Sequence, residues 1–197
     1  MRKRLTSLLI LTIAALPLFA NGGQESDAPF NDHDLVAVHR IHLREVVRIG
    51  VPEDKAPFSY VDADGRWQGY DVYFARRIAK EILDGKEKYL RLVPVNRENW
   101  LDYLESDQVD IVLPGFAPGP EENALAEFAL PYRKDGEDLI APAVRKGNSE
   151  LLLWLNDVIN RRIEADFFHK DYEATLRPVY GRTAGPEAVV IERGKVE

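Results

Sequence analysis

The stretch "YLRLVPVNRENWLDYLESDQVDIVLP", residues 89–114, contains two strand patterns separated by a helical one. Residues 89–95 and 108–114 are rich in Leu, Val and Ile, which favours buried β-strands. Residues 98–106, "ENWLDYLES", predict a short helix between them. A strand, a helix and a strand in this order predict two parallel strands joined by a crossover helix, the unit of α/β domains.

The preceding residues repeat this alternation. Residues 44–51, "REVVRIGV", form a β-branched run that predicts a buried strand, and residues 71–83, "DVYFARRIAKEIL", place apolar side chains at helical spacing. Asp71 is the predicted N-cap of that helix. The turn signal Asp62-Ala63-Asp64-Gly65 predicts a hairpin between the two. The order of elements predicts an α/β fold with a mainly parallel sheet, flanking helices and right-handed crossovers.

The C-terminal third predicts a further strand and a long helix. Residues 138–147, "DLIAPAVRKG", give a strand that is interrupted by Pro142. Residues 148–165, "NSELLLWLNDVINRRIEA", predict a helix that is capped by Asn148 or Ser149.

Composition and the N-terminus indicate an exported protein. The chain has 197 residues, no cysteine and a formal net charge of −7. Three cations, Arg2 to Arg4, precede an apolar run, Leu8 to Ala20, which is the layout of a secretory signal peptide and is shorter than the roughly 20 residues that span a membrane. Its removal would lower the charge from −7 to −10, and such acidity argues against nucleic acid as a partner. Without cysteine, disulfides and a lipid anchor on an N-terminal cysteine are excluded.

We therefore expect three segments: a signal peptide over residues 1–20, a polar tether or arm over 21–45 and a single α/β domain over 46–197. His33, His39 and His42 lie close together in the arm, but no acidic residue at ligand spacing completes a metal site. The sequence has no glycine-rich phosphate loop, nucleophile elbow or paired carboxylates. We predict no metal, no cofactor and no enzymatic activity.

Four segments in order carry a family resemblance. They are "GVPEDKAPFSYVDADGRWQGYDVYFARRIAKEI" (50–82), "WLDYLESDQVDIVLPG" (100–115), "EFALPY" (127–132) and "AVRKGNSELLLWLNDVI" (143–159). Together they resemble the extracellular solute-binding proteins of polar amino-acid ABC importers, of the family 3 type. The resemblance implies a type II periplasmic-binding-protein fold, in which two α/β lobes joined by crossing strands close on an amino acid.

The chain departs from this family in the length of one connection. In the family, the aromatic-proline exit leads into an entire second lobe before the chain returns. Here only ten residues separate Tyr132 from Ala143, and a lobe of about 100 residues does not fit there. We therefore expect a single lobe, with the two crossings merged into one strand over residues 139–145.

The second departure lies in the ligand loop. The resemblance implies hydroxyls and an arginine after the third strand for the ligand's α-carboxylate, but this chain has Ala117, Pro118 and Gly119 there, and Glu122 at the arginine's place. Lys55 replaces an aromatic platform. A glutamate repels the carboxylate that an arginine would bind. The cleft-lining residues that the resemblance implies are Lys55, Phe58, Arg97, Gly115, Phe116, Ala117, Gly119, Glu122 and Tyr132.

These features predict an exported, solute-binding-like component of an amino-acid ABC transport system, with degenerate or altered ligand binding. A protein-interaction module derived from one lobe and a secreted relic without a partner are the alternatives. The apolar loop around Phe116 predicts a contact site on the exposed cleft face, with Phe116 and Tyr132 as anchors. The partner would be an ABC permease, a second protein chain or a second copy in a homodimer; binding of a small polar solute stays open.

Overall fold

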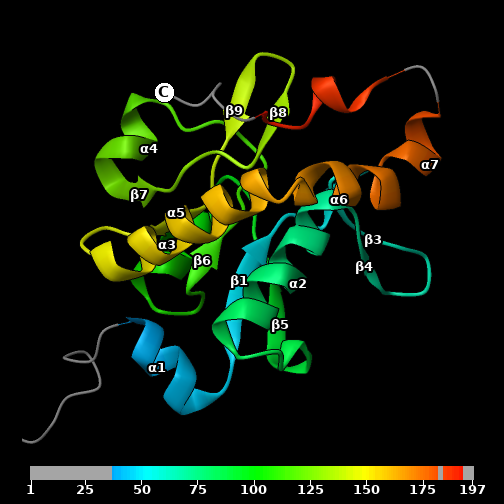
Figure 1. Cartoon of the computed structure of the whole chain (residues 1–197). Helices are drawn as coiled ribbons and strands as arrows, with labels where there is room; N and C mark the ends of the chain where they lie inside the picture. The colour runs from blue at the N-terminus through cyan, green and yellow to red at the C-terminus, as the bar shows by residue number, and fades with distance from the viewer. Residues whose placement is uncertain (1–36, 182–183, 193–197) are drawn as a thin grey trace, which may run out of the picture. The chain divides into compact units, whose positions relative to one another are not determined.

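The computed structural model describes residues 37–181 and 184–192, which all fall in one compact unit (Figure 1). The predicted signal peptide and the first part of the tether lie outside these residues. A five-stranded sheet in the order β5-β1-β6-β10-β7 forms the centre. In that order, the strands span Leu90–Pro94, Val47–Val51, Ile111–Val112, Ala143–Arg145 and Ala126–Phe128. β1 is parallel to β5 and β6, whereas β10 is antiparallel to β6 and β7. The predicted α/β class is confirmed, and β10 makes the sheet mixed.

Helices cover both faces of this sheet. Successive residues of a strand point to opposite faces, so Ile111 packs into one apolar core and Val112 into another. The larger core includes residues of α2 (Tyr70–Ile82), α5 (Ser149–Glu164) and α6 (Phe167–Thr175). The smaller core is built around Trp100 and Leu104 of α3 (Trp100–Glu105). Figure 1 shows α2 and α5 in front of the strands.

The folded part begins earlier than the sequence predicted. α1 (Ala37–Arg44) lies within the predicted tether, and its Ala37 and Ile41 are buried against the larger core. These two residues are four apart, so one helical turn brings both to the same face. The prediction of a tether was therefore wrong for residues 37–44, because two well-spaced apolar residues suffice to anchor a short helix.

A three-stranded sheet precedes α2. It consists of β2 (Asp54–Lys55), β3 (Ser59–Val61) and β4 (Trp67–Gln68). The Asp62 carboxylate accepts hydrogen bonds from the backbone N–H groups of Asp64 and Arg66, at 3.0 and 2.9 Å, which fixes the turn. The hairpin predicted here is confirmed.

The short connection between Tyr132 and Ala143 forms its own hairpin. β8 (Arg133–Asp135) pairs with β9 (Asp138–Ile140) around Gly136, which has a φ of +64°. The prediction of one merged strand over 139–145 was wrong, because the hairpin pairs separately from the central sheet and Pro142, which has no N–H, interrupts the chain before β10. The hairpin also holds the C-terminal segment, since the Lys134 N–H donates to the Val189 carbonyl at 2.7 Å.

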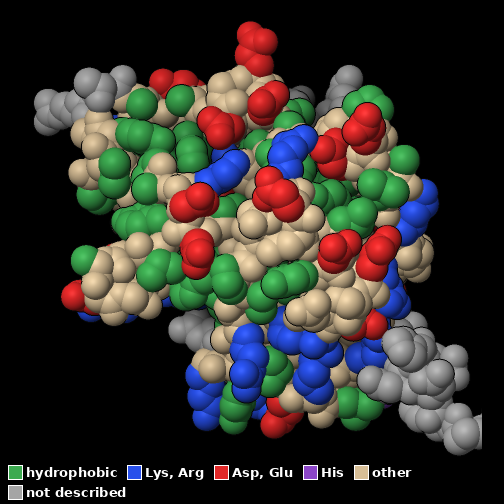
Figure 2. Space-filling view, turned by 180° about the vertical axis from the view of Figure 1, so that it is seen from behind, with side chains coloured by type: hydrophobic (Ala, Val, Ile, Leu, Met, Phe, Trp, Pro, Cys, Tyr) green, Lys and Arg blue, Asp and Glu red, His purple; other side chains and the backbone are tan. Residues whose placement is uncertain are grey.

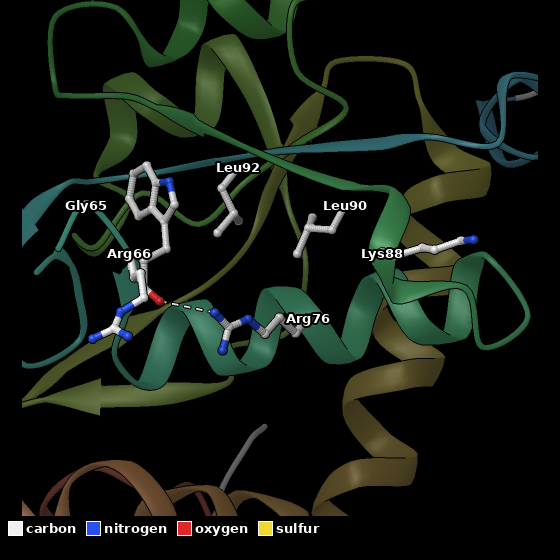
Figure 3. Close-up of a pocket in the computed structure, with 7 residues that line it drawn as sticks. Gly65, Arg66, Arg76, Lys88, Leu90 and Leu92 are labelled. Atoms are coloured by element: carbon white, nitrogen blue, oxygen red, sulfur yellow. Dashed lines mark hydrogen bonds between the residues drawn. The ribbon is translucent and has the colours of Figure 1, made fainter.

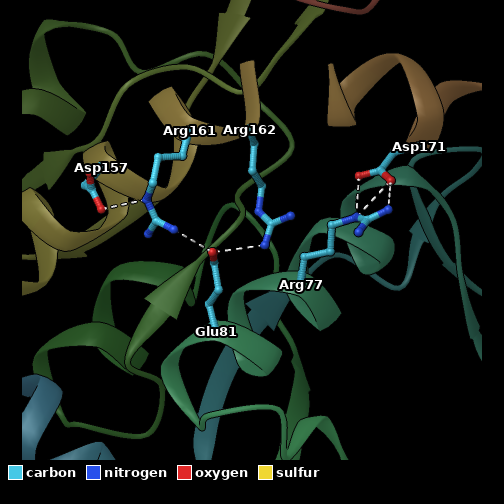
Figure 4. A network of polar contacts seen from close by, with 6 residues as sticks. All are labelled: Arg77, Glu81, Asp157, Arg161, Arg162 and Asp171. Carbon is cyan, nitrogen blue, oxygen red and sulfur yellow. Dashed lines mark hydrogen bonds and ion pairs between the residues drawn. The ribbon is translucent and has the colours of Figure 1, made fainter. Parts of the chain in front are cut away.

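A polar network joins the three helices of the larger core (Figure 4). Arg77 of α2 donates to both carboxylate oxygens of Asp171 of α6. Glu81 of α2 forms ion pairs with Arg161 and Arg162 of α5, each at 2.9 Å. These contacts fix α2 against α5 and α6, and α2 in turn positions part of the candidate site.

The remaining elements are short. They are α4 (Pro120–Leu125), α7 (Arg177–Tyr180), and the single 3₁₀ turns η2 (Glu87–Tyr89) and η3 (Pro186–Ala188). Within residues 37–181 and 184–192, no helix combines the length and the apolar character needed to cross a membrane.

Candidate functional site

The loop after β6 forms the floor of the candidate site. Gly115 is buried there with a φ of +66°, a conformation that favours glycine. The Lys55 ammonium, which extends from β2, donates to the Gly115 carbonyl at 3.1 Å. A Cβ at Gly115 would lie 3.2 Å from Cδ of Lys55, so the lysine stem already covers this point. The predicted residues Lys55 and Gly115 are thus brought together by a contact within the chain.

Glu122 closes the other end of this loop. Its carboxylate accepts a hydrogen bond from the Gly119 N–H at 2.9 Å, at the start of α4, and forms an ion pair with Arg97 at 2.7 Å. Hydrogen bonds from the backbone N–H groups of Glu122 and Gly119, and then the charge of Arg97, lower the pKa of the Glu122 carboxyl. The carboxylate is therefore held in its ionised form. The donors at this end of the loop serve a side chain of the chain itself.

Arg97 also covers the aromatic residue of the loop. Its guanidinium lies 4.4 Å from the centre of the Phe116 ring, which is a cation–π distance. Phe116 in turn meets the buried Trp100 in a T-shaped contact, with ring centroids 5.8 Å apart. Phe116 is half-buried rather than fully exposed. Part of the apolar surface that the sequence predicted to face water is thus covered.

A second group of residues surrounds Arg133, at the start of the connecting hairpin. Arg133 is buried and donates to both oxygens of the buried Asp71, at 2.7 and 3.0 Å. Its guanidinium lies 3.9 Å from the centre of the half-buried Phe58 ring. Burial opposes the positive charge, but the charge of Asp71, the hydrogen bonds to Asp71 and the interaction with Tyr132 together outweigh this effect, and the pKa of Arg133 is raised. Arg133 therefore keeps its positive charge inside the protein.

Tyr132 belongs to the interior. Its ring stacks on Phe74 of α2 at 4.6 Å, and the residue is fully buried. Burial, and then the negative charge of Asp71, raise the pKa of its hydroxyl well above the ordinary value. The prediction that Tyr132 anchors an exposed contact face was wrong, because the connecting hairpin folds its side chain against α2.

The predicted site residues therefore form two groups. Lys55 and Gly115 contact each other, and Arg97, Phe116, Gly119 and Glu122 form a connected set along the same loop as the half-buried Ala117. Phe58 and Tyr132 instead meet around Arg133. In the first group, the Lys55 ammonium and the Arg97 guanidinium each contact an acceptor of the chain itself.

The pair formed by Asp71 and Arg133 was not predicted from the sequence. Asp71 is not the N-cap of α2, as was predicted; Gly69 is, and Asp71 lies in the first turn. A usable signal was present, because Asp71 shares a helical face with Ala75, Ile78 and Ile82, which are all buried. A carboxylate on an apolar face requires a cation nearby. Its partner, 62 positions away, could not be identified from spacing alone.

The described residues offer no cluster of three metal-ligating side chains. His39 and His42 lie on α1, with His42 4.0 Å from the Asp84 carboxylate, and His33 lies outside the described residues.

Comparison with known proteins gives relatives that bind amino acids and one that is named as an enzyme. Cyclohexadienyl dehydratase of Pseudomonas aeruginosa is 31% identical over 129 residues, which cover 66% of this chain and 44% of the dehydratase. The L-cystine-binding protein TcyJ of Escherichia coli K12 is 26% identical over 168 residues, covering 85% of this chain and 58% of TcyJ. The chain thus spans about half the length of these curated relatives.

The solved structures that resemble this chain also include amino-acid-binding proteins. The cysteine-binding protein from Campylobacter jejuni superposes with a TM-score of 0.74 and 27% identity, covering 80% of this chain and 100% of that one. The arginine-bound form of domain 1 from TmArgBP superposes with a TM-score of 0.56 and 26% identity, covering 61% of this chain and 96% of that domain. These likenesses confirm the predicted single lobe of a periplasmic-binding-protein-like fold. The family model for bacterial extracellular solute-binding proteins, family 3, matches residues 47–174, and the chain belongs to this family.

Proposed function

We propose that this protein is an exported, solute-binding-like component of an amino-acid ABC transport system whose own amino-acid site is closed from within. Family membership and the relatives that bind cystine, cysteine and arginine support the general role. The observation that carries the altered binding is the position of Glu122, whose carboxylate takes the Gly119 N–H and the Arg97 guanidinium.

The closure follows from the chemistry of carboxylate recognition. The family loop is expected to supply hydroxyls and an arginine for the ligand's α-carboxylate. In this chain a carboxylate from position 122 lies at that end of the loop, and it is kept ionised by the contacts that lower its pKa. An incoming α-carboxylate would meet a like charge and would have to displace it. A charge-assisted hydrogen bond contributes about 1.5–3 kcal/mol, so losing one weakens binding by roughly ten- to a hundredfold.

The lack of a second lobe does not by itself explain weak binding. The arginine-bound domain 1 of TmArgBP holds its ligand in a structure that this chain covers to 96%. We therefore expect weak binding because of the side chains at the loop, Lys55 and Glu122, rather than because of the missing lobe. This assignment can be tested on a single chain.

The experiment compares wild type with Glu122→Arg, which restores the residue that the family resemblance implies, and with Glu122→Gln, which removes the charge without adding a donor pair. Thermal unfolding is followed with each common amino acid, since a ligand that binds the folded state raises Tm in proportion to RT ln(1 + [L]/Kd). Wild type should show no shift at millimolar ligand. Glu122→Gln, which removes the like charge and frees Arg97 from its ion pair, should gain a small shift, and Glu122→Arg should gain a larger one. Micromolar binding of an amino acid by wild type would refute the proposal.

We also propose that the protein is not an enzyme. One relative is named as a dehydratase, but most are named as binding proteins. The carboxyl of Glu122 has a lowered pKa and is committed to an ion pair, so it is poorly suited to donate a proton at neutral pH. An assay for cyclohexadienyl dehydration with the purified chain should give no turnover above the background rate.

A contact through the loop is the second candidate function, and half-exposed Phe116 is the observation that favours it. The partner would be an ABC permease, another protein or a second copy of the chain. Sedimentation of wild type and Phe116→Asp over a concentration series tests this role. Wild type should associate and the variant should remain monomeric; two monomeric proteins would exclude self-association through Phe116.

A further inference from the structure

Two arginines lie side by side at one edge of the central sheet. The register of the parallel strands pairs Arg48 of β1 with Arg91 of β5, and paired positions present their side chains on the same face. Like charges in such positions destabilise a sheet. The Asp110 carboxylate lies 3.2 Å from Arg48 but also 2.6 Å from Arg44, so it serves two cations. Among the described residues no ion pair reaches Arg91, which is exposed.

β5 is also an edge strand with a free row of backbone groups. Within the described part of the chain it pairs with β1 alone. The Val95 N–H donates to the Val51 carbonyl at 3.0 Å. Because backbone groups alternate along a strand, those of Leu90 and Leu92 point away from β1. Pro94, which lacks an N–H, falls on the same outer side and costs the sheet no hydrogen bond.

A groove of about 590 Å³ lies beside this edge on the face of the sheet opposite Arg91. Its floor contains Leu90 and Leu92, which are half-buried, together with Trp67. Figure 3 shows Arg66 and Lys88 at opposite ends of this row, with Arg76 facing it from α2. Arg76 donates to the Trp67 carbonyl at 3.1 Å, and no carboxylate of the described residues pairs with it. The groove is thus apolar at its floor, and Arg76 and Lys88 are the cations on its rim. Arg66 adds little positive charge, because it forms ion pairs with Asp62 and Asp64, at 3.3 and 2.6 Å.

Several cations lie near this edge of the sheet. Figure 2 shows Lys and Arg side chains gathered at the lower end of the molecule, where Figure 1 places α1 and β5. A strand that paired with β5 would present alternate side chains to the groove and to the arginine face. Apolar side chains suit the groove, and acidic side chains suit the face that carries Arg48 and Arg91. The chain as a whole is acidic, so this positive edge is a local feature.

We propose that β5 is a docking edge for an extended segment of a partner protein in which apolar and acidic residues alternate. The segment adds as a sixth strand through the backbone groups of Leu90 and Leu92, which is a recurrent mode of peptide recognition. A charged residue and a proline on an edge strand, here Arg91 and Pro94, disfavour its pairing with the edge strand of another molecule. Arg91 would repel a basic strand and would stay unpaired beside a long apolar one. An acidic strand is therefore the preferred occupant.

The test uses two labelled synthetic peptides, TEVEVET and TKVKVKT, and fluorescence anisotropy with the full chain. We expect the acidic peptide to bind and the basic one not to bind. Arg91→Glu should weaken binding of the acidic peptide by about tenfold or more, because like charges would then meet across the new pair. The same substitution places a glutamate beside Arg48, so it should not destabilise the fold, and thermal unfolding checks this. Hydrogen exchange should show protection at the Leu90 and Leu92 amides in the complex.

The matched control is Lys146→Glu, which makes the same change of charge beyond β10, three strands away in the sheet. It should bind TEVEVET within about twofold of wild type. Equal losses in both variants would show attraction by net charge alone and overturn the proposal. Unchanged binding in Arg91→Glu, failure of TEVEVET to bind wild type, or protection elsewhere than β5 would overturn it as well.

Discussion

Arg133 and Arg97 each hold a carboxylate in the candidate site, but the two ion pairs lie in opposite environments. The side chains of Arg133 and Asp71 are 1% and 0% exposed, and their contact is bidentate. The side chains of Arg97 and Glu122 are 61% and 17% exposed and meet through one nitrogen. A buried charge that loses its partner has no water to replace it, whereas a surface charge does.

The two ion pairs should therefore have different roles, the buried one in the stability of the fold and the surface one in ligand binding. The buried pair joins the first turn of α2 to the hairpin that stands where a second lobe would be expected, so it holds the single lobe together at that point. The surface pair fixes the start of α4 and occupies the loop expected to receive a ligand. Changes at the first pair should therefore alter stability, and changes at the second should alter binding.

The largest expected effect is at the buried pair. Arg133→Met leaves the Asp71 carboxylate buried and unpaired, and we expect a loss of about 3–5 kcal/mol in the free energy of unfolding. Urea denaturation followed by circular dichroism measures it. The double variant Asp71→Leu/Arg133→Met removes both charges and should recover most of the loss. A cost below about 1 kcal/mol for the single variant would mean that water reaches the pair, and the contrast with the surface pair would fail.

A smaller effect is expected at Phe58, whose ring lies against the Arg133 guanidinium. Phe58→Leu keeps an apolar side chain but removes the aromatic face, and we expect a loss of about 1 kcal/mol. In the Asp71→Leu/Arg133→Met background the cation is absent, so the same substitution should cost less. Equal costs in both backgrounds would show that Phe58 contributes by packing alone.

Much of the central sheet was predictable because it rests on local apolar patterns. The strands around Ile49, Leu92 and Ile111 and the helices that begin near Tyr70 and Ser149 follow from the periodicity of their side chains. The register that places Arg48 beside Arg91 could not be predicted, because it depends on contacts between segments about 40 residues apart.

The site was predictable in its residues but not in its contacts. The resemblance indicated which positions line the loop, and the structure joins several of them. The resemblance could not show that Glu122 would cap α4 and pair with Arg97, because both contacts depend on where the loop and the helix meet. Nor could it show that Tyr132 turns inward, since the hairpin after it has no counterpart in the sequence pattern of the family.

At the surface pair we expect little change in stability. Glu122→Gln keeps an oxygen that can accept from the Gly119 N–H and loses only the charge that faces Arg97, which is largely in water. The urea midpoint should match that of wild type within experimental error. A fall comparable with that of Arg133→Met would show that the surface pair is structural, and the assignment of Glu122 to ligand exclusion would lose its support.

The smallest effect is a local titration of the same carboxylate. The pKa of Glu122 is lowered in the folded protein, so its contribution to stability is present above the unfolded pKa of about 4.3 and is lost as pH falls through the folded value. The Gly119 amide proton, which donates to this carboxylate, should report the step as a chemical-shift change below about pH 4.3 in NMR spectra. Arg133 has a raised pKa, so it keeps its positive charge throughout this range. Glu122→Gln is the control and should show no such step at Gly119. A Gly119 shift that stays constant down to about pH 3 in wild type would show that the carboxylate does not hold this amide, and the loop would then be open to a ligand.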